Sequence, residues 1–182
     1  MEEIRTGRLL LCAFRKSDCD DLLEFLSQLE DNEFEGYPGI TYESGREQLH
    51  ERVGSPEYYA MELTASGKVI GNIYCGNRDC AAREVGFIVN ERYRKNGYAA
   101  EALSAVIERM FRDGVHRVYA ECDPRNTRSW RLLEKVGMRR EAHFRQNVYF
   151  QREENGTPRW KDTYVYALTE GDRSCLRTAV GS

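Results

Sequence analysis

Apolar and polar positions in the first part of the chain predict one strand followed by helices. Residues 8–14 are mostly apolar and favour a strand. Ser17 followed by Asp20 is typical of a helix start. Apolar residues then recur at helical spacing (Leu22, Leu23, Phe25, Leu26 and Leu29). A second, shorter helix is predicted over residues 43–53, inside a longer polar stretch.

The middle of the chain predicts three strands and a longer helix. Residues 58–63 and 68–76 favour a hairpin, and residues 84–89 favour a third strand with alternate apolar positions. A polar turn over residues 94–97 follows. Behind it, apolar residues recur three and four positions apart, as on one face of a helix (Ala99, Ala102, Leu103, Val106, Ile107 and Met110).

The last third of the chain predicts a strand, a short helix and two more strands. Alternate apolar residues mark the strand (Val118, Ala120 and Cys122). Asn126 can cap the helix that follows, and Gly137 can end it. Residues 144–152 and 160–168 then flank a turn at residues 155–156. The predicted order is therefore strand, helices, three strands, helix, strand, helix and two strands.

The turn between the strand at 84–89 and the following helix points to anion binding. Backbone N–H groups at a helix start have no intrahelical partner, and the helix dipole adds partial positive charge there. A turn that contains Gly97 at this place predicts a site for phosphate or pyrophosphate. The chain has no P-loop string and no Gly-x-Gly-x-x-Gly string. On this turn alone, an ordinary strand–turn–helix corner is an equal alternative.

Two motifs, in this order, resemble the GCN5-related N-acetyltransferase (GNAT) family. The first is Arg-x-x-Gly-x-Ala over residues 94–99, which is similar to the family's acyl-CoA pyrophosphate loop. The second is similar to Asn-x-x-Ala/Ser-x-x-Leu-Tyr-x-Lys-x-Gly-Phe, with Leu133 at the tyrosine position and Met138 at the phenylalanine position. Its matching residues are Asn126, Ser129, Leu132, Lys135 and Gly137.

The resemblance extends over about residues 5–170. It is strongest to the subgroup of ribosomal-protein N-terminal acetyltransferases, because of the opening at 6–11 and the strand at 156–164. It implies a single α/β domain over residues 1–170, with a C-terminal tail over residues 171–182. In such a domain a mixed, mostly antiparallel sheet carries helices on both faces.

The resemblance also implies where acetyl-CoA binds. Its pyrophosphate would lie on the loop formed by Arg94, Lys95, Asn96, Gly97, Tyr98 and Ala99. Its pantetheine arm would run beside the strand residues Phe87, Ile88 and Val89, held by main-chain hydrogen bonds in the manner of an added strand. Asn126 and Ser129 would also contact this arm.

Acetyl transfer to an amine needs a base for the ammonium group, donors for the thioester oxygen and an acid for the departing thiolate. The resemblance implies direct attack by the amine, with backbone N–H groups near Ile88 or Val89 serving the oxygen. Leu133 cannot donate a proton, which leaves Ser129 as the candidate acid. The alternative for Ser129 is a plain first-turn helix residue.

Glu84 is the candidate base, and its alternative is a surface charge at a strand end. Glu141 and Tyr93 are weaker candidates. The implied function is transfer of an acetyl group from acetyl-CoA to a primary amine, either a protein N-terminus or a polyamine-like or aminoglycoside-like molecule. The alternative function, from a different class of protein, is an acyl-CoA sensor with little turnover. Loops at about residues 31–57 and 139–160 would select the acceptor.

Composition mainly excludes other functions. The 182 residues fit one domain, and a formal net charge of −3 leaves no nucleic-acid footprint. The basic residues Arg139, Arg140 and Arg145 favour a solvated face. Cys75 and Cys80 lack further ligands nearby, so we expect no metal. Without a membrane-spanning run or a signal-peptide core, we expect a cytoplasmic monomer or homodimer.

Overall fold

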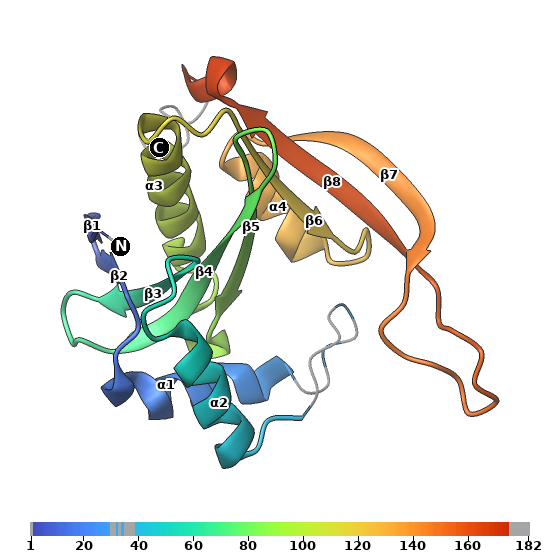
Figure 1. Cartoon of the computed structure of the whole chain (residues 1–182), viewed down its shortest axis with the longest axis horizontal. Helices are drawn as coiled ribbons and strands as arrows, with labels where there is room; N and C mark the ends of the chain where they lie inside the picture. Colours follow the sequence, from blue (N-terminus) through green and yellow to red (C-terminus); the bar gives the residue numbers. More distant parts are fainter. Residues whose placement is uncertain (1, 30–31, 33, 35–38, 175–182) are drawn as a thin grey trace.

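A single mixed sheet organises the computed structural model, which describes residues 2–29, 32, 34 and 39–174 (Figure 1). The strand order is β1-β2-β3-β4-β5-β6-β8-β7. Every neighbouring pair is antiparallel except β5 and β6, which are parallel. The strands are β1 (Ile4–Arg5), β2 (Leu9–Cys12), β3 (Tyr58–Leu63), β4 (Val69–Arg78), β5 (Ala82–Val89), β6 (Arg117–Cys122), β7 (Arg139–Val148) and β8 (Lys161–Thr169).

Helices cover both faces of this sheet, as predicted. Helices α3 (Tyr98–Arg112) and α4 (Thr127–Lys135) pack on one face, and α1 (Cys19–Leu26) and α2 (Tyr42–Arg52) pack on the other. Strand β2 shows how alternation divides the two cores, because successive side chains point to opposite faces. Leu9 and Leu11 join the core under α3, whereas Leu10 and Cys12 join the core under α1 and α2. The predicted fold class is therefore confirmed.

The two halves of the sheet separate between β5 and β6 (Figure 1). These strands pair only where residues 82–84 of β5 meet residues 117–119 of β6. Beyond that point β5 continues against β4 and β6 continues against β8. The β6-facing edge of residues 85–89 is thus left without a strand partner within the described part of the chain. The result is a V-shaped opening between parallel strands.

Some element boundaries differ from the prediction. Strand β7 begins at Arg139, before the predicted residue 144, and ends at Val148. Most of its side chains are exposed, so its sequence carries no alternating apolar signal, and backbone pairing with β8 holds it in place. Strand β1 was not predicted, because its two residues bear no pattern of their own. Helix α1 begins at Cys19, after a short 3₁₀ turn over Lys16–Asp18.

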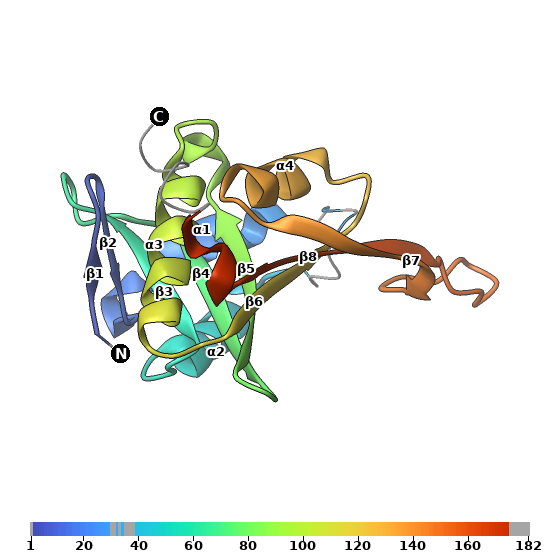
Figure 2. The same ribbon diagram turned by 90° about the horizontal axis from the view of Figure 1, so that it is seen from above.

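Strands β7 and β8 form an arm that projects from the body of the molecule in both views (Figure 2). The predicted turn at 155–156 lies in the loop at its tip. After β8 the chain makes a 3₁₀ turn over Glu170–Asp172, and Arg173 pairs with Glu108 on α3 at 2.6 Å. Of the tail predicted over residues 171–182, residues 175–182 lie outside the described part of the chain.

Candidate active site

The open edge of β5 presents backbone groups to the V-shaped opening. The Asn90 N–H donates to the Ile70 carbonyl on β4 at 2.8 Å, which fixes the alternation along the strand. Residues 88 and 90 therefore direct their backbone groups toward β4, and Phe87 and Val89 direct theirs toward the opening. Of the two predicted oxyanion donors, Val89 faces the opening and Ile88 does not. Phe87 was predicted only to line the pantetheine. Its backbone N–H faces the opening as that of Val89 does, so Phe87 is a second candidate donor to the thioester oxygen.

The loop after β5 has the geometry of an anion site. Gly97 adopts a left-handed conformation, with φ of 81°, and forms the N-cap of α3. The first helical bond runs from the Glu101 N–H to the Gly97 carbonyl at 3.0 Å. The N–H groups of residues 98–100 therefore precede the first intrahelical bond and are available to a ligand. Lys95 is also left-handed, with φ of 65°, so the loop is sharply bent.

The side chains of the loop hold its backbone rather than fill the anion site. Arg94 turns back, donates from Nε to the Val89 carbonyl at 3.0 Å and pairs with Glu91. The Asn96 amide donates to the Tyr93 and Arg94 carbonyls. Tyr93, the weaker base candidate, lies in the short 3₁₀ turn Glu91–Tyr93 before the loop. These contacts attach the loop to the open end of β5.

We expect Gly97→Val to weaken CoA binding by more than about tenfold, or about 1.4 kcal/mol. A β-branched residue is strained at positive φ, and its Cβ would lie 3.4 Å from Arg8 Nη2, beside the N–H groups. Gly67→Val is the matched control, because Gly67 has φ of 72° and nothing within 4 Å of a Cβ there. Calorimetry is the measurement. Equal CoA affinity in the two folded variants would remove the loop from the binding site.

The start of α4 lies against the other side of the opening. Asn126 caps α4 as predicted, since its side-chain oxygen accepts from the Ser129 N–H at 3.2 Å. Burial raises the pKa of the Cys122 thiol to about 11, and a hydrogen bond with the Ser129 side chain opposes part of that rise. The Ser129 hydroxyl therefore faces the last residue of β6. Leu133 is fully buried in the core and offers nothing to the opening.

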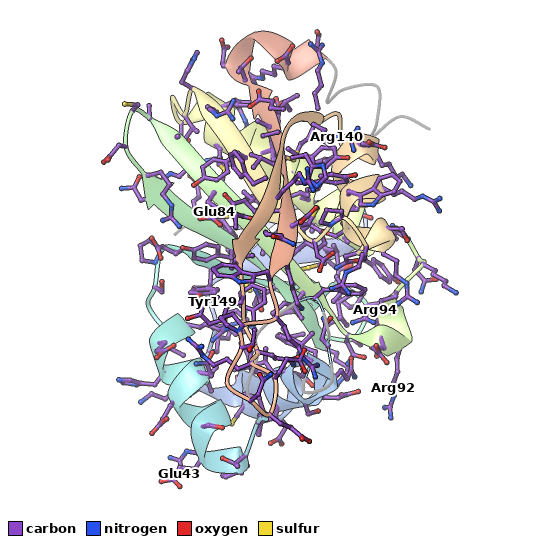
Figure 3. The ribbon with its side chains drawn as sticks, turned by 90° about the vertical axis from the view of Figure 1, so that its right-hand side faces the viewer. Glu43, Glu84, Arg92, Arg94, Arg140 and Tyr149 are labelled. Carbon is purple, nitrogen blue, oxygen red and sulfur yellow. The ribbon has the colours of Figure 1, made fainter. Side chains whose placement is uncertain are left out.

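A polar cluster occupies the opposite face of the sheet, at the closed end of the opening. The register sets Gly76, Glu84 and Tyr119 side by side on three neighbouring strands. Arg78 pairs with Glu84, and hydrogen bonds with the Tyr119 and Tyr74 hydroxyls and with Glu84 raise the pKa of its guanidinium. Figure 3 labels Glu84, which lies in β5, and Arg94, which lies in the loop after that strand. Glu84 is thus half-buried and already paired with a cation.

Two glycines leave room for this cluster. A side chain at Gly76 would collide with the Tyr74 hydroxyl, so Tyr74 can lie along the strand only over a glycine. Gly86 borders the same ring, with Tyr74 carbons 3.7 and 3.8 Å from a Cβ placed there. Glycines at both positions therefore accommodate the Tyr74 side chain beside Glu84.

Glu121 is the site residue that the sequence prediction missed. Counted on from the pair of Glu84 with Tyr119, it stands level with Gly86 and on the same face as Glu84. Glu121 is exposed, yet desolvation of its carboxyl and then the charge of Glu84 raise the pKa of that carboxyl, against a smaller opposing effect of Arg78. Within the described residues no cation lies within ion-pair distance of it. The sequence marks Glu121 as a polar position between Ala120 and Cys122, but it does not reveal that Glu84 lies beside it.

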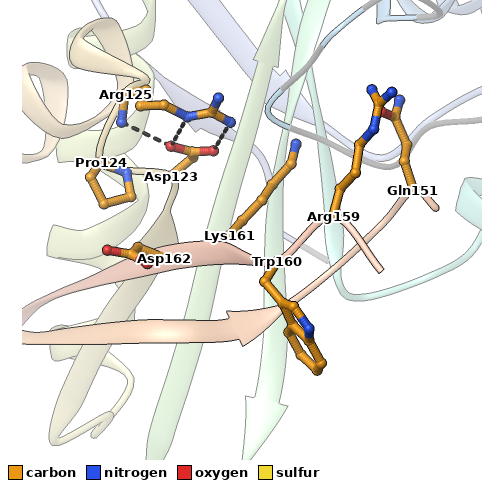
Figure 4. A pocket seen from close by; sticks show the side chains of 8 residues that line it. All are labelled: Asp123, Pro124, Arg125, Gln151, Arg159, Trp160, Lys161 and Asp162. Atoms are coloured by element: carbon orange, nitrogen blue, oxygen red, sulfur yellow. Dashed lines mark hydrogen bonds and ion pairs between the residues drawn. The ribbon is translucent and has the colours of Figure 1, made fainter. Parts of the chain in front are cut away.

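A cavity of about 380 Å³ lies between the β6–α4 connection and the arm (Figure 4). Its lining residues are Asp123, Pro124, Arg125, Gln151, Arg159, Trp160, Lys161 and Asp162. Burial alone would raise the pKa of Asp123, but hydrogen bonds and charge from Arg125 lower it. The predicted acceptor segment at 139–160 reaches this cavity. Of the segment at 31–57, residues 31, 33 and 35–38 lie outside the described part of the chain.

The remaining candidates stand apart from the opening. Glu141 pairs with Arg117, Arg139 pairs with Asp172 at 3.2 Å, and Arg140 stacks over the Tyr164 ring. No group of three or more metal-binding side chains occurs among the described residues. None of the helices in that part of the chain is both long enough and apolar enough to cross a bilayer.

Comparison with known proteins gives a consistent result. Residues 8–139 match the model of the acetyltransferase (GNAT) domain family. The chain is 31% identical over 173 residues to the uncharacterized N-acetyltransferase YnaD of Bacillus subtilis (strain 168), covering 92% of this chain and 96% of that protein. It superposes on the GNAT-family acetyltransferase of Bacillus anthracis with a TM-score of 0.84, 29% identity and coverage of 93% and 99%.

A third similarity is to Mycobacterium smegmatis RimJ, whose structure was determined in complex with CoA-disulfide. The TM-score is 0.72, with 20% identity and coverage of 98% of this chain and 94% of that one. At this level of identity the likeness concerns the fold alone.

Proposed function

Because the chain belongs to the GNAT family of acetyltransferases, we propose that it transfers an acetyl group from acetyl-CoA to a primary amine. The observation that carries this proposal is the V-shaped opening between β5 and β6, which ends at an anion-binding helix start. The pyrophosphate would lie on the N–H groups of residues 98–100. The pantetheine arm would then run back along β5 and meet Val89 before Phe87.

The register of β5 and β6 supports a reacting centre close to Phe87. Counted on from the Glu84–Tyr119 pair, Cys122 stands level with Phe87, and Ser129 faces Cys122. Glu121, one residue earlier, stands on the opposite face of the sheet. A thioester carbonyl at this level would accept from the Phe87 N–H, with a candidate base on one side and a candidate acid on the other. Val89 would hold the arm.

In the proposed reaction Glu121 accepts the proton of the acceptor ammonium, and the free amine attacks the thioester carbon. The C–N bond forms and the nitrogen loses its second proton to solvent. The C–S bond breaks, the CoA thiolate takes a proton from Ser129, and Ser129 regains one from solvent. Glu121 suits the role of base because it has no paired cation among the described residues and its pKa is raised. Glu84, held by Arg78, acts on Glu121 through its charge.

We therefore expect Glu84→Gln to move the acid limb of the kcat profile to lower pH. Glu84 is negative and raises the pKa of Glu121, so its neutralisation lowers that pKa and keeps Glu121 in its basic form to lower pH. Glu43→Gln, on the remote helix α2, is the control (Figure 3). A pH–rate profile that coincides with that of the parent would show that Glu84 does not act on the base.

The acceptor amine belongs to one of two classes, a protein N-terminus or a small molecule. The cavity between the arm and the β6–α4 connection has room for groups attached to an amine of either kind. The test is an acceptor screen with N-terminal peptides, polyamines and aminoglycosides, read by free-thiol release. Leu133 favours a second candidate function, an acyl-CoA sensor, because it removes the tyrosine acid. The sensor would bind CoA and release no thiol with any acceptor.

A further inference from the structure

The segment at the start of the chain reaches across to the CoA loop. The Thr6 hydroxyl donates to Glu101 Oε1 at 2.6 Å, and the Arg8 N–H donates to the same oxygen at 2.8 Å. Arg8 Nε and Nη2 approach the other oxygen, Oε2, at 2.7 and 2.6 Å. The Glu101 carboxylate, in the first turn of α3, is therefore surrounded by donors from residues 6–8. This segment belongs to the opening motif at 6–11.

The same guanidinium also holds the loop itself. Arg8 Nη1 donates to the Asn96 carbonyl at 2.9 Å, and its guanidinium carbon lies 4.4 Å from the centre of the Tyr98 ring. Gly97, between these two residues, is the left-handed N-cap of α3. Arg8 thus joins the residue before the glycine, the residue after it and the first turn of the helix. The hydrogen bond from Arg8 also occupies the Asn96 carbonyl.

Glu101 explains why a cation is needed at this place. A carboxylate in the first turn of a helix stabilises the helix. The same negative charge repels a pyrophosphate that binds at that helix start. Burial would raise the pKa of Glu101, but hydrogen bonds from Thr6 and Arg8 lower it, so the carboxylate stays charged. Its charge must then be cancelled by a neighbour, and Arg8 is the cation in contact with it.

We infer that Arg8 is a positioning residue of the pyrophosphate loop. It cancels the charge of Glu101 and ties the Asn96 carbonyl, so that the N–H groups at the start of α3 face the ligand in a positive field. This inference rests on the proposed function, because it takes CoA to be the ligand. It gives the opening motif a role in donor binding, although residues 6–11 lie more than eighty positions before the loop.

The test compares CoA with pantetheine, which lacks the pyrophosphate, in four variants. We expect Arg8→Gln to weaken CoA binding about tenfold and to leave pantetheine binding unchanged, since the effect is electrostatic and local. Glu101→Gln should bind CoA as well as the parent or better. The double variant should return to within about threefold of the parent, because the repelling charge is gone along with its partner. Arg5→Gln is the control for loss of a nearby exposed charge.

Calorimetry for CoA and ligand-observed NMR for pantetheine give the affinities, and a melting curve confirms folding. If Arg8→Gln does not fold, Arg8→Met serves, because it keeps the apolar stem and removes the charge, with an expected loss for CoA alone. An equal loss for both ligands would make Arg8 a structural residue and overturn the inference. A double variant that binds CoA as weakly as Arg8→Gln would also overturn the inference. If the parent protein does not bind CoA, the proposed function itself is refuted, and the inference about Arg8 fails with it.

Discussion

Glu121→Gln is expected to lower kcat by about 10²-fold, the scale at which a positioned general base acts. Glutamine keeps the shape of the side chain and cannot accept the ammonium proton. The raised pKa of Glu121 sets the pH window: the parent loses activity as pH falls through that pKa, because the carboxyl is then protonated. The variant should lose this dependence along with the rate. Steady-state kinetics across pH is the measurement.

The matched control is Glu141→Gln, which removes a charge that is paired with Arg117. It should leave kcat within about twofold of the parent, as for a surface ion pair. CoA affinity should be the same in both variants, because neither carboxylate lies in the loop. A Glu121→Gln enzyme that keeps more than half of the parent kcat would exclude Glu121 as the base and return attention to Glu84 or to a water.

Ser129→Ala is expected to lower kcat by a factor of about 10² and to change KM little. The hydroxyl faces the side of the opening where the sulfur would leave, and its hydrogen bond strengthens only as charge develops there. The Ser129 N–H, which Asn126 caps, is unaffected by the change. Helix α4 should therefore stay intact. Kinetics under conditions where chemistry limits the rate gives the measurement.

Thr127→Ala is the control, because Thr127 begins the same helix and its side chain is exposed. It should leave kcat near that of the parent. Ser129→Cys should recover part of the rate, since a thiol can also donate. The acid role is excluded if Ser129→Ala melts normally and retains more than half of the parent kcat. Ser129 would then be a first-turn helix residue, and the thiolate would take its proton from water.

Local chemistry made the loop and the α4 cap predictable from sequence. A glycine between a strand and an apolar helical face leaves little choice of conformation, and Gly97 is left-handed as such a turn requires. Asn126 stands just before the predicted α4 and three residues before Ser129, which is the spacing of a helix N-cap. The structure confirms this cap. The all-apolar strand β2 fits a sheet covered on both faces, as the resemblance implied, because its residues enter both cores. These features depend on neighbours in the chain.

The features that were missed depend on contacts between distant segments. Glu121 joins Glu84 only through the register of two parallel strands, which no local pattern encodes. Arg8 meets Glu101 across ninety-three positions of sequence. Ile88 was grouped with Val89 as an oxyanion donor, because the direction of each backbone group is set by the pairing with β4. The exposed strand β7 is likewise defined by its partner β8.

Acceptor-dependent release of CoA thiol tests the central claim most directly. The protein would be incubated with acetyl-CoA and each acceptor class in turn. Thiol release would be followed over time, and the mass of the acceptor would be measured by mass spectrometry. The account predicts that thiol appears only with an amine acceptor and that one acetyl group is found on that amine for each thiol released. Tight CoA binding with no thiol release for any acceptor class would contradict it and identify the protein as a sensor.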